Sequence, residues 1–123
     1  MYPLKTYRDI QGVPTSGSQS CRPFPEYTQT VLLVTGDVTT VTVPTQASDN
    51  LAAFFAYSYG QDVFISPFSA PTLAVPTTTV TLSVDELLTP GCGRAVKAGQ
   101  VLQLLSPGTT VYVTISYYAI VQD

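Results

Sequence analysis

The amino-acid sequence predicts an all-β domain: an antiparallel β-sandwich, jelly-roll-like, with an extended N-terminal arm. Three observations predict it. Segments in which apolar and polar residues alternate recur from Thr28 onward, Gly, Pro, Asn or Asp residues separate them, and helical periodicity is almost absent. The 123 residues suffice for one core and not for two. We expect seven or eight strands, a number for which the jelly roll is the commonest form.

The first 27 residues are expected to form the arm, and residues 28–123 the sandwich domain. This N-terminal stretch contains four prolines, the Gly- and Ser-containing run Thr15–Ser20 and three of the five basic residues. Its apolar positions follow neither period 2 nor period 3.6. Such an arm is usually ordered by what it lies against. Its own domain, a sister subunit or a different protein could provide that surface.

The strands are predicted in chain order by alternation and by β-branched residues, which suit a half-buried pleated surface. The clearest predicted strand begins at Val111, where apolar residues at every second position form one apolar face. Turns are expected at Thr35–Asp37 and Ser58–Gln61, and Asp85–Leu88 is the only helix-like piece, at most a single turn. The candidate strands are Thr30–Thr35, Val38–Val43, Leu51–Ser58, Asp62–Ser66, Thr79–Val84, Val101–Leu105 and Val111–Val121.

Two of these segments are apolar on both faces. Val31–Val34 and Leu51–Tyr57 lack the alternation that a strand with one solvated face shows. Either both faces are covered within the fold, or the second face binds an oligomer or host partner. Aromatic side chains suit such a face because they supply large contact area at a low entropy cost. We therefore name Phe54, Phe55 and Tyr57 as candidate interface residues.

The composition excludes several classes of function. A net charge of −3, with no basic residue from Pro23 to Gly93, argues against nucleic-acid binding. No apolar run is long enough for a signal peptide or a membrane span, so we expect no membrane partner. The chain has no histidine, the usual general base, and we expect no enzyme activity and no cofactor. Cys21 and Cys92 are too few for a zinc site and are expected to be free thiols.

Aromatic side chains keep one further class open. Tyrosine-rich β-domains with few charges also describe carbohydrate-binding modules, although those modules commonly use tryptophan, which this chain lacks. Packing at strand ends is the simpler explanation for these rings. The aromatic residues that could stack on a sugar are Tyr57, Tyr59, Phe68, Tyr112 and Tyr118.

From Val41 to Tyr118 the chain resembles a type of small virion protein of tailed bacteriophages, found among capsid decoration (cement) and head-associated proteins. The order of features carries the resemblance, and Cys92 departs from the bulkier or polar residue expected in its turn. The matching segments are Val41–Thr45, Leu51–Phe55, Asp62–Ser66, Leu87–Arg94, Leu102–Ser106 and Val113–Tyr118.

The resemblance implies a homo-oligomer, with a trimer favoured, that binds the major capsid protein on the outer capsid surface and bridges capsid subunits. Such a protein is made in the host cytoplasm. Its basic arm would meet an acidic capsid surface, which makes the arm residues Tyr2, Leu4, Tyr7, Arg8 and Arg22 candidates for contact with a neighbouring chain. The alternatives are another virion part, such as a tail, collar or head-fibre base, or the carbohydrate-binding module.

Overall fold

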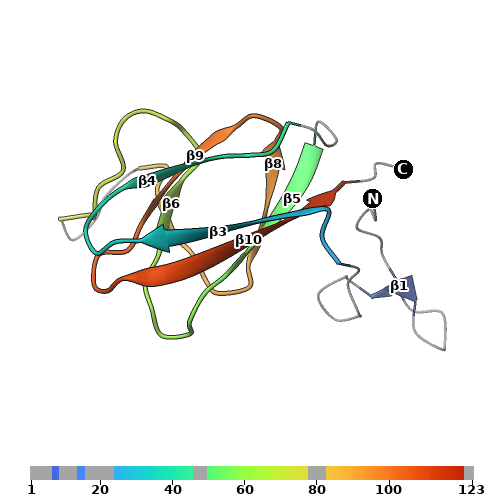
Figure 1. Cartoon of the computed structure of the whole chain (residues 1–123), viewed down its shortest axis with the longest axis horizontal. Coiled ribbons are helices and arrows are strands. Elements are labelled where there is room, and N and C mark those ends of the chain that lie inside the picture. The colour runs from blue at the N-terminus through green and yellow to red at the C-terminus, as the bar shows by residue number, and fades with distance from the viewer. Residues whose placement is uncertain (1–6, 9–13, 16–23, 46–49, 78–82, 121–123) are drawn as a thin grey trace.

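Eight strands of the computed structural model form two antiparallel sheets of four strands each (Figure 1). The structure describes residues 7–8, 14–15, 24–45, 50–77 and 83–120, and no helix occurs among them. One sheet has the order β3-β10-β5-β8 and the other β4-β9-β6-β7. The strands are β3 (Tyr27–Leu33), β4 (Thr39–Thr42), β5 (Asn50–Ala56), β6 (Phe64–Ser66), β7 (Glu86–Leu87), β8 (Gly93–Lys97), β9 (Val101–Leu105) and β10 (Val111–Ala119).

The pairing of these strands is nested along the chain. β3 pairs with β10, β4 with β9, β5 with β8 and β6 with β7, so the first half of the domain pairs with the second half in reverse order. Successive pairs alternate between the two sheets, and the β10–β5 and β6–β9 ladders complete each sheet. The described domain is thus one long antiparallel hairpin that has been folded over itself.

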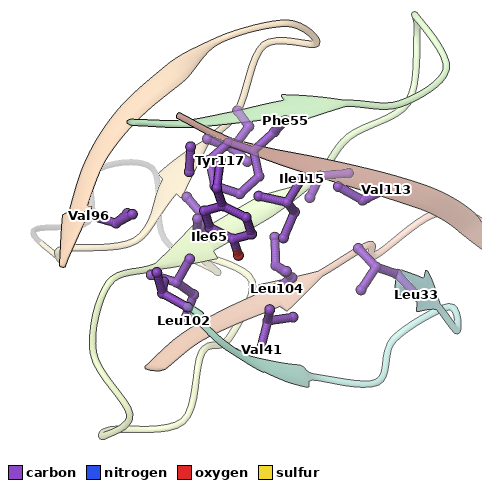
Figure 2. Close-up of a cluster of buried hydrophobic side chains, with 14 of the residues drawn as sticks. Leu33, Val41, Phe55, Ile65, Val96, Leu102, Leu104, Val113, Ile115 and Tyr117 are labelled. Carbon is purple, nitrogen blue, oxygen red and sulfur yellow. The ribbon is translucent and has the colours of Figure 1, made fainter. Parts of the chain in front are cut away.

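The core lies between the two sheets, with side chains from both pointing toward each other (Figure 2). On β10 the inward residues Val111, Val113, Ile115 and Tyr117 are all 6 % exposed or less, as the alternation from Val111 predicts. They meet Leu102 and Leu104 of β9, together with residues of five other strands. Those are Leu33, Val41, Leu51, Ala53, Phe55, Ile65 and Val96.

Polar side chains link the two sheets along both edges of the core. At one edge the hydroxyl of Tyr117 donates to Gln29 Oε1 (2.7 Å), and Gln29 Nε2 donates to the carbonyl of Thr42 on β4 (3.0 Å). At the opposite edge Arg94 of β8 pairs with Glu86 of β7, with Nε donating to Oε1 at 2.8 Å. These contacts hold the sheets in one relative position.

Most predicted strands are confirmed, with boundaries that shift by at most three residues and with Val101–Leu105 unchanged. The first strand begins at Tyr27, one residue before the predicted domain boundary, and ends at Leu33. The helix-like reading of Asp85–Leu88 is wrong because Glu86 and Leu87 pair with β6 as strand β7. Cys92 was expected in a turn, and strand β8, which the sequence did not indicate, begins at the next residue, Gly93.

Two other predictions lie partly or wholly outside the described residues. Of the segment Thr79–Val84, only Ser83 and Val84 are described, and neither is in a strand. Of the predicted arm, residues 1–6, 9–13 and 16–23 are not described. Two short elements within it are described: β1 (Tyr7–Arg8) and β2 (Pro14–Thr15) pair with each other antiparallel.

Candidate interaction surface

The two sheets differ in what lies over their outer faces. On β9, Leu102 and Leu104 point into the core, so Gln103 and Leu105 belong to the outer face of β4-β9-β6-β7. Both are nevertheless buried, at 2 % and 3 % exposure. The outer face of this sheet is therefore covered by the chain itself over its central strands.

The cover is the loop that follows β6, and the amide of Gln103 holds it. Gln103 Nε2 donates to the carbonyls of Phe68 (2.6 Å) and Pro71 (2.9 Å), and Gln103 Oε1 accepts the backbone N–H of Leu73 (3.0 Å). Leu73 is itself only 3 % exposed. Nearby, Gln100 Nε2 donates to the carbonyl of Pro67 (3.1 Å). A buried amide with both donors used ties the loop to the sheet.

The outer face of β3-β10-β5-β8 has a different composition, and we call it the neutral face. Its side chains are hydroxyl, aliphatic or aromatic, and none of them is charged. The nearest charges along these outward rows are Lys97, which lies opposite Asn50 at the far end of β8, and Glu26, which lies just before β3. The residues of the neutral face are Thr28, Thr30, Leu32, Ala52, Phe54, Ala56, Gly93, Ala95, Tyr112, Thr114, Ser116 and Tyr118.

Aromatic packing organises the middle of the neutral face. The rings of Phe54 and Tyr118 meet edge to face, with centroids 5.6 Å apart and planes at 89°. Gly93 lies opposite Phe54 on β8, and a Cβ atom at Gly93 would come within 2.7 Å of the Phe54 ring. The absence of a side chain on Gly93 thus lets the Phe54 ring lie across β8.

Three exposed apolar side chains gather where β3 ends and β10 begins, and we call them the apolar corner. Leu32 and Tyr112 are directly opposite each other in the β3–β10 ladder and are 44 % and 66 % exposed. Val34 follows just after β3 and is 48 % exposed. Large apolar side chains left open next to one another on a sheet mark a surface that another molecule can cover.

The structure separates the three interface candidates that the sequence places on β5 and just after it. Phe54 is half-buried on the neutral face, whereas Phe55 is fully buried in the core and has no exposed surface for a partner. Tyr57 is half-buried beside the core, and its hydroxyl donates to the carbonyl of Leu88. Burial first, and then the negative charges of Cys92 and Asp62, raises the pKa of Tyr57 to about 12.

The five arm candidates cannot be placed as side chains. Tyr2, Leu4 and Arg22 lie outside the described residues. Tyr7 and Arg8 form β1, whose backbone pairs with Pro14 and Thr15 of β2. Their predicted contact with a neighbouring chain stays a prediction.

The aromatic residues considered for sugar stacking are not all on one exposed surface. Tyr59 is 90 % exposed in the β5–β6 turn, whereas Phe68 is 54 % exposed in the loop at the other end of β6. Tyr112 belongs to the apolar corner, and Tyr118 is buried against Phe54. These rings therefore do not form one platform.

A hollow of about 150 Å³ opens between the sheets at the β7–β8 edge. Apolar side chains, among them Ile65, Val96 and Leu102, line most of it, and the Glu86–Arg94 pair also lines it. The hydrogen bond from Arg94 holds the pKa of Glu86 below its usual range. Within the described ranges, no three His, Cys, Asp or Glu side chains are grouped as metal ligands. The Glu86–Arg94 ion pair joins the edge strands β7 and β8.

The sequence identified part of this surface. Apolar residues on both faces of Val31–Val34 indicated a second face, and Leu32 and Val34 do lie on it. The sequence did not indicate that Ala52, Ala95 and Gly93 belong to the neutral face, because small residues show no clear alternation of apolar and polar positions. The signal that could have found them is the lack of any charge at alternate positions from Thr28 to Leu32 and from Tyr112 to Tyr118.

Comparison with known proteins yields no relative: no protein-family model, no curated protein and no solved structure matches this chain. In the part of the chain that the structure describes, no helix has the length and hydropathy that crossing a membrane requires.

Proposed function

We propose that this protein is a non-enzymatic structural protein of a virion, which binds the outer capsid surface and stabilises the shell by bridging capsid subunits. Its partners in this proposal are the major capsid protein and further copies of itself. The resemblance of Val41–Tyr118 to phage decoration proteins is one support. The surface of the described domain is the other.

The fold proposed for this role is a jelly-roll β-sandwich. A jelly roll has eight strands in two sheets and is built from two Greek keys. Renumbered from one to eight, the strands of this domain have the orders 1-8-3-6 and 2-7-4-5. The nested pairing that produces these orders is what results when one long hairpin is rolled into two layers. Virus capsid proteins and lectins both use this architecture, so the fold alone does not select a function.

The observation that carries the proposal is the contrast between the two outer faces. The chain covers the β4-β9-β6-β7 face with its own loop, while the neutral face has no charge and ends in the open apolar corner. A free monomer normally surrounds itself with charged residues for solubility. A protein whose surface is covered by many neighbouring subunits does not need these charged residues. A few aromatic anchors can supply most of its binding energy.

The test is co-sedimentation with shells of the virus that encodes the protein. Ala56 is exposed on the neutral face, and Ala56→Glu places a buried charge in the contact, which should abolish co-sedimentation. Thr40, exposed on the other sheet, provides the matched control Thr40→Glu, which should bind normally. Capsid binding that survives Ala56→Glu and is lost in Thr40→Glu would mean that the β4-β9-β6-β7 face, and not the neutral face, contacts the capsid. Wild-type protein that stays in the supernatant would remove the capsid from the proposal.

The predicted arm is tested in the same assay. A chain that lacks residues 1–25 keeps every residue of the buried core, since the first of them is Leu33. We expect this truncated domain to fold and to lose capsid binding. Capsid binding equal to that of the full chain would exclude the arm from the interaction.

A further inference from the structure

Among the residues that the structure describes, no strand pairs with the outer edge of β3. β3 is the first strand of its sheet, its seven residues include no charge and no proline, and all seven pair with β10 in unbroken register. The free N–H and C=O groups of an edge strand can pair with another chain. Proteins usually prevent this with a charge, a proline, a bulge or a very short strand, and β3 has none of the four.

The other three edges of the two four-stranded sheets are protected or short. β8 contains Arg94 and Lys97, β7 is two residues long, and β4 is four residues long. β3 is therefore the longest edge and the only one that combines this length with neutrality. The apolar corner continues from it, because Leu32 belongs to both.

We propose that β3 pairs with β3 of a second copy of this chain, antiparallel and across a two-fold axis at Thr30. The occupant must be an uncharged strand of matching length with a free edge, and the chain itself offers one. The inference rests on the proposed function only in that the function calls for self-association. It is measured on the free protein, without capsids.

Charge favours this pairing and sets its direction. Two copies of net charge −3 repel each other unless they meet through neutral surface. The nearest acidic residues, Glu26 and Asp37, lie beyond the two ends of β3. Antiparallel pairing about Thr30 keeps the two Glu26 residues eight positions apart, roughly 26 Å. Parallel pairing in register would bring them to about 5 Å, where like charges repel.

The geometry of the pairing also joins the two neutral faces. Directly opposed residues in an antiparallel ladder point to the same face, so Thr28 of one copy meets Leu32 of the other. All seven positions of β3 can pair, which adds about seven backbone hydrogen bonds. The result is one eight-stranded sheet whose outer face carries both apolar corners. This contact is two-fold, so the trimer that the resemblance favours would need a different one.

The experiment introduces a charge at Thr30, on the proposed two-fold axis. Sedimentation equilibrium of the full chain then measures the mass of the assembly. Wild type should be a dimer of about 26 kDa, twice the 13.2 kDa of one chain. Thr30→Lys and Thr30→Glu each place like charges directly opposite, and each should weaken the dimer by a factor of up to about five. An equimolar mixture of the two variants should restore the dimer. Thr40→Lys, on the edge strand β4, should leave it intact.

A second measurement guards against a folding defect in the charged variants. Thr30→Cys places two thiols across the axis at a spacing that suits a disulfide, and mild oxidation should give a covalent dimer. Wild type, which already contains Cys21 and Cys92, is the control, together with Thr40→Cys. A wild-type monomer or trimer would refute the inference, as would a dimer that neither Thr30→Lys nor Thr30→Glu weakens. The dimer measurement is independent of the capsid assay, so a loss of capsid binding in Ala56→Glu would not change the conclusion about β3.

Discussion

Replacement of Gln103 by methionine should detach the loop that covers the β4-β9-β6-β7 face. Methionine keeps the length and volume of the side chain but removes its donors and its acceptor. The N–H of Leu73, in a residue that is 3 % exposed, would lose its partner, which costs about 1–3 kcal/mol. The carbonyls of Phe68 and Pro71 belong to exposed residues and can be rehydrated, so each adds only about 0.5 kcal/mol.

The expected loss in the free energy of unfolding is therefore about 2–4 kcal/mol. Urea denaturation at neutral pH measures it, and hydrogen exchange at the amide of Leu73 should become faster at the same time. Gln100→Met is the matched control, because Gln100 donates a single hydrogen bond to this loop, at Pro67. A loss no greater than that of Gln100→Met, or an unchanged exchange rate at Leu73, would refute the idea that Gln103 holds the loop.

Two further predictions concern the contacts that join the sheets. Burial raises the pKa of Tyr117 to about 12, so the folded chain holds this proton more tightly than the unfolded chain. The stability that this protonated hydroxyl contributes is complete below pH 10 and falls as the pH rises from 10 to 12. Tyr117→Phe should make the decline of the unfolding free energy over this range less steep. Equal slopes in wild type and variant would contradict the prediction. The Glu86–Arg94 pair is exposed, so Glu86→Gln should lower the free energy of unfolding by at most about 1 kcal/mol at neutral pH and leave it unchanged at acid pH. Urea denaturation at both pH values measures this. A larger loss that persists in acid would assign Glu86 a role besides this ion pair.

How much of the neutral face could be foreseen depends on residue type. β-branched and aromatic residues with a period of two showed where the long strands run, because successive side chains of a strand point to opposite faces. On β10 this pattern also identified the inward residues from Val111 to Ala119. On β5 it could not, since Phe54 and Phe55 are equally apolar. The register with β10, which puts Phe55 opposite Ile115 in the core, decides which ring faces out.

The short strands could be found only in the folded chain. Glu86 and Leu87 have no period that two residues could display, and they are a strand because Ile65 and Phe64 lie opposite them. Gly93 begins a strand for the same reason, since it pairs with Phe54. Local propensity acts over one turn or a few residues, whereas a strand at a sheet edge is defined by its partner.

The amino-acid sequence by itself determined that this protein is made of strands with apolar faces, and that positive charge is confined to the N-terminal stretch and to Arg94 and Lys97. Only the tertiary structure decided which strands pair, which face the chain covers for itself and which face it leaves open. The physical reason is that alternation depends on neighbours along one strand. Burial of Gln103 and exposure of Leu32 depend on segments tens of residues away, and on whether a loop lies over them.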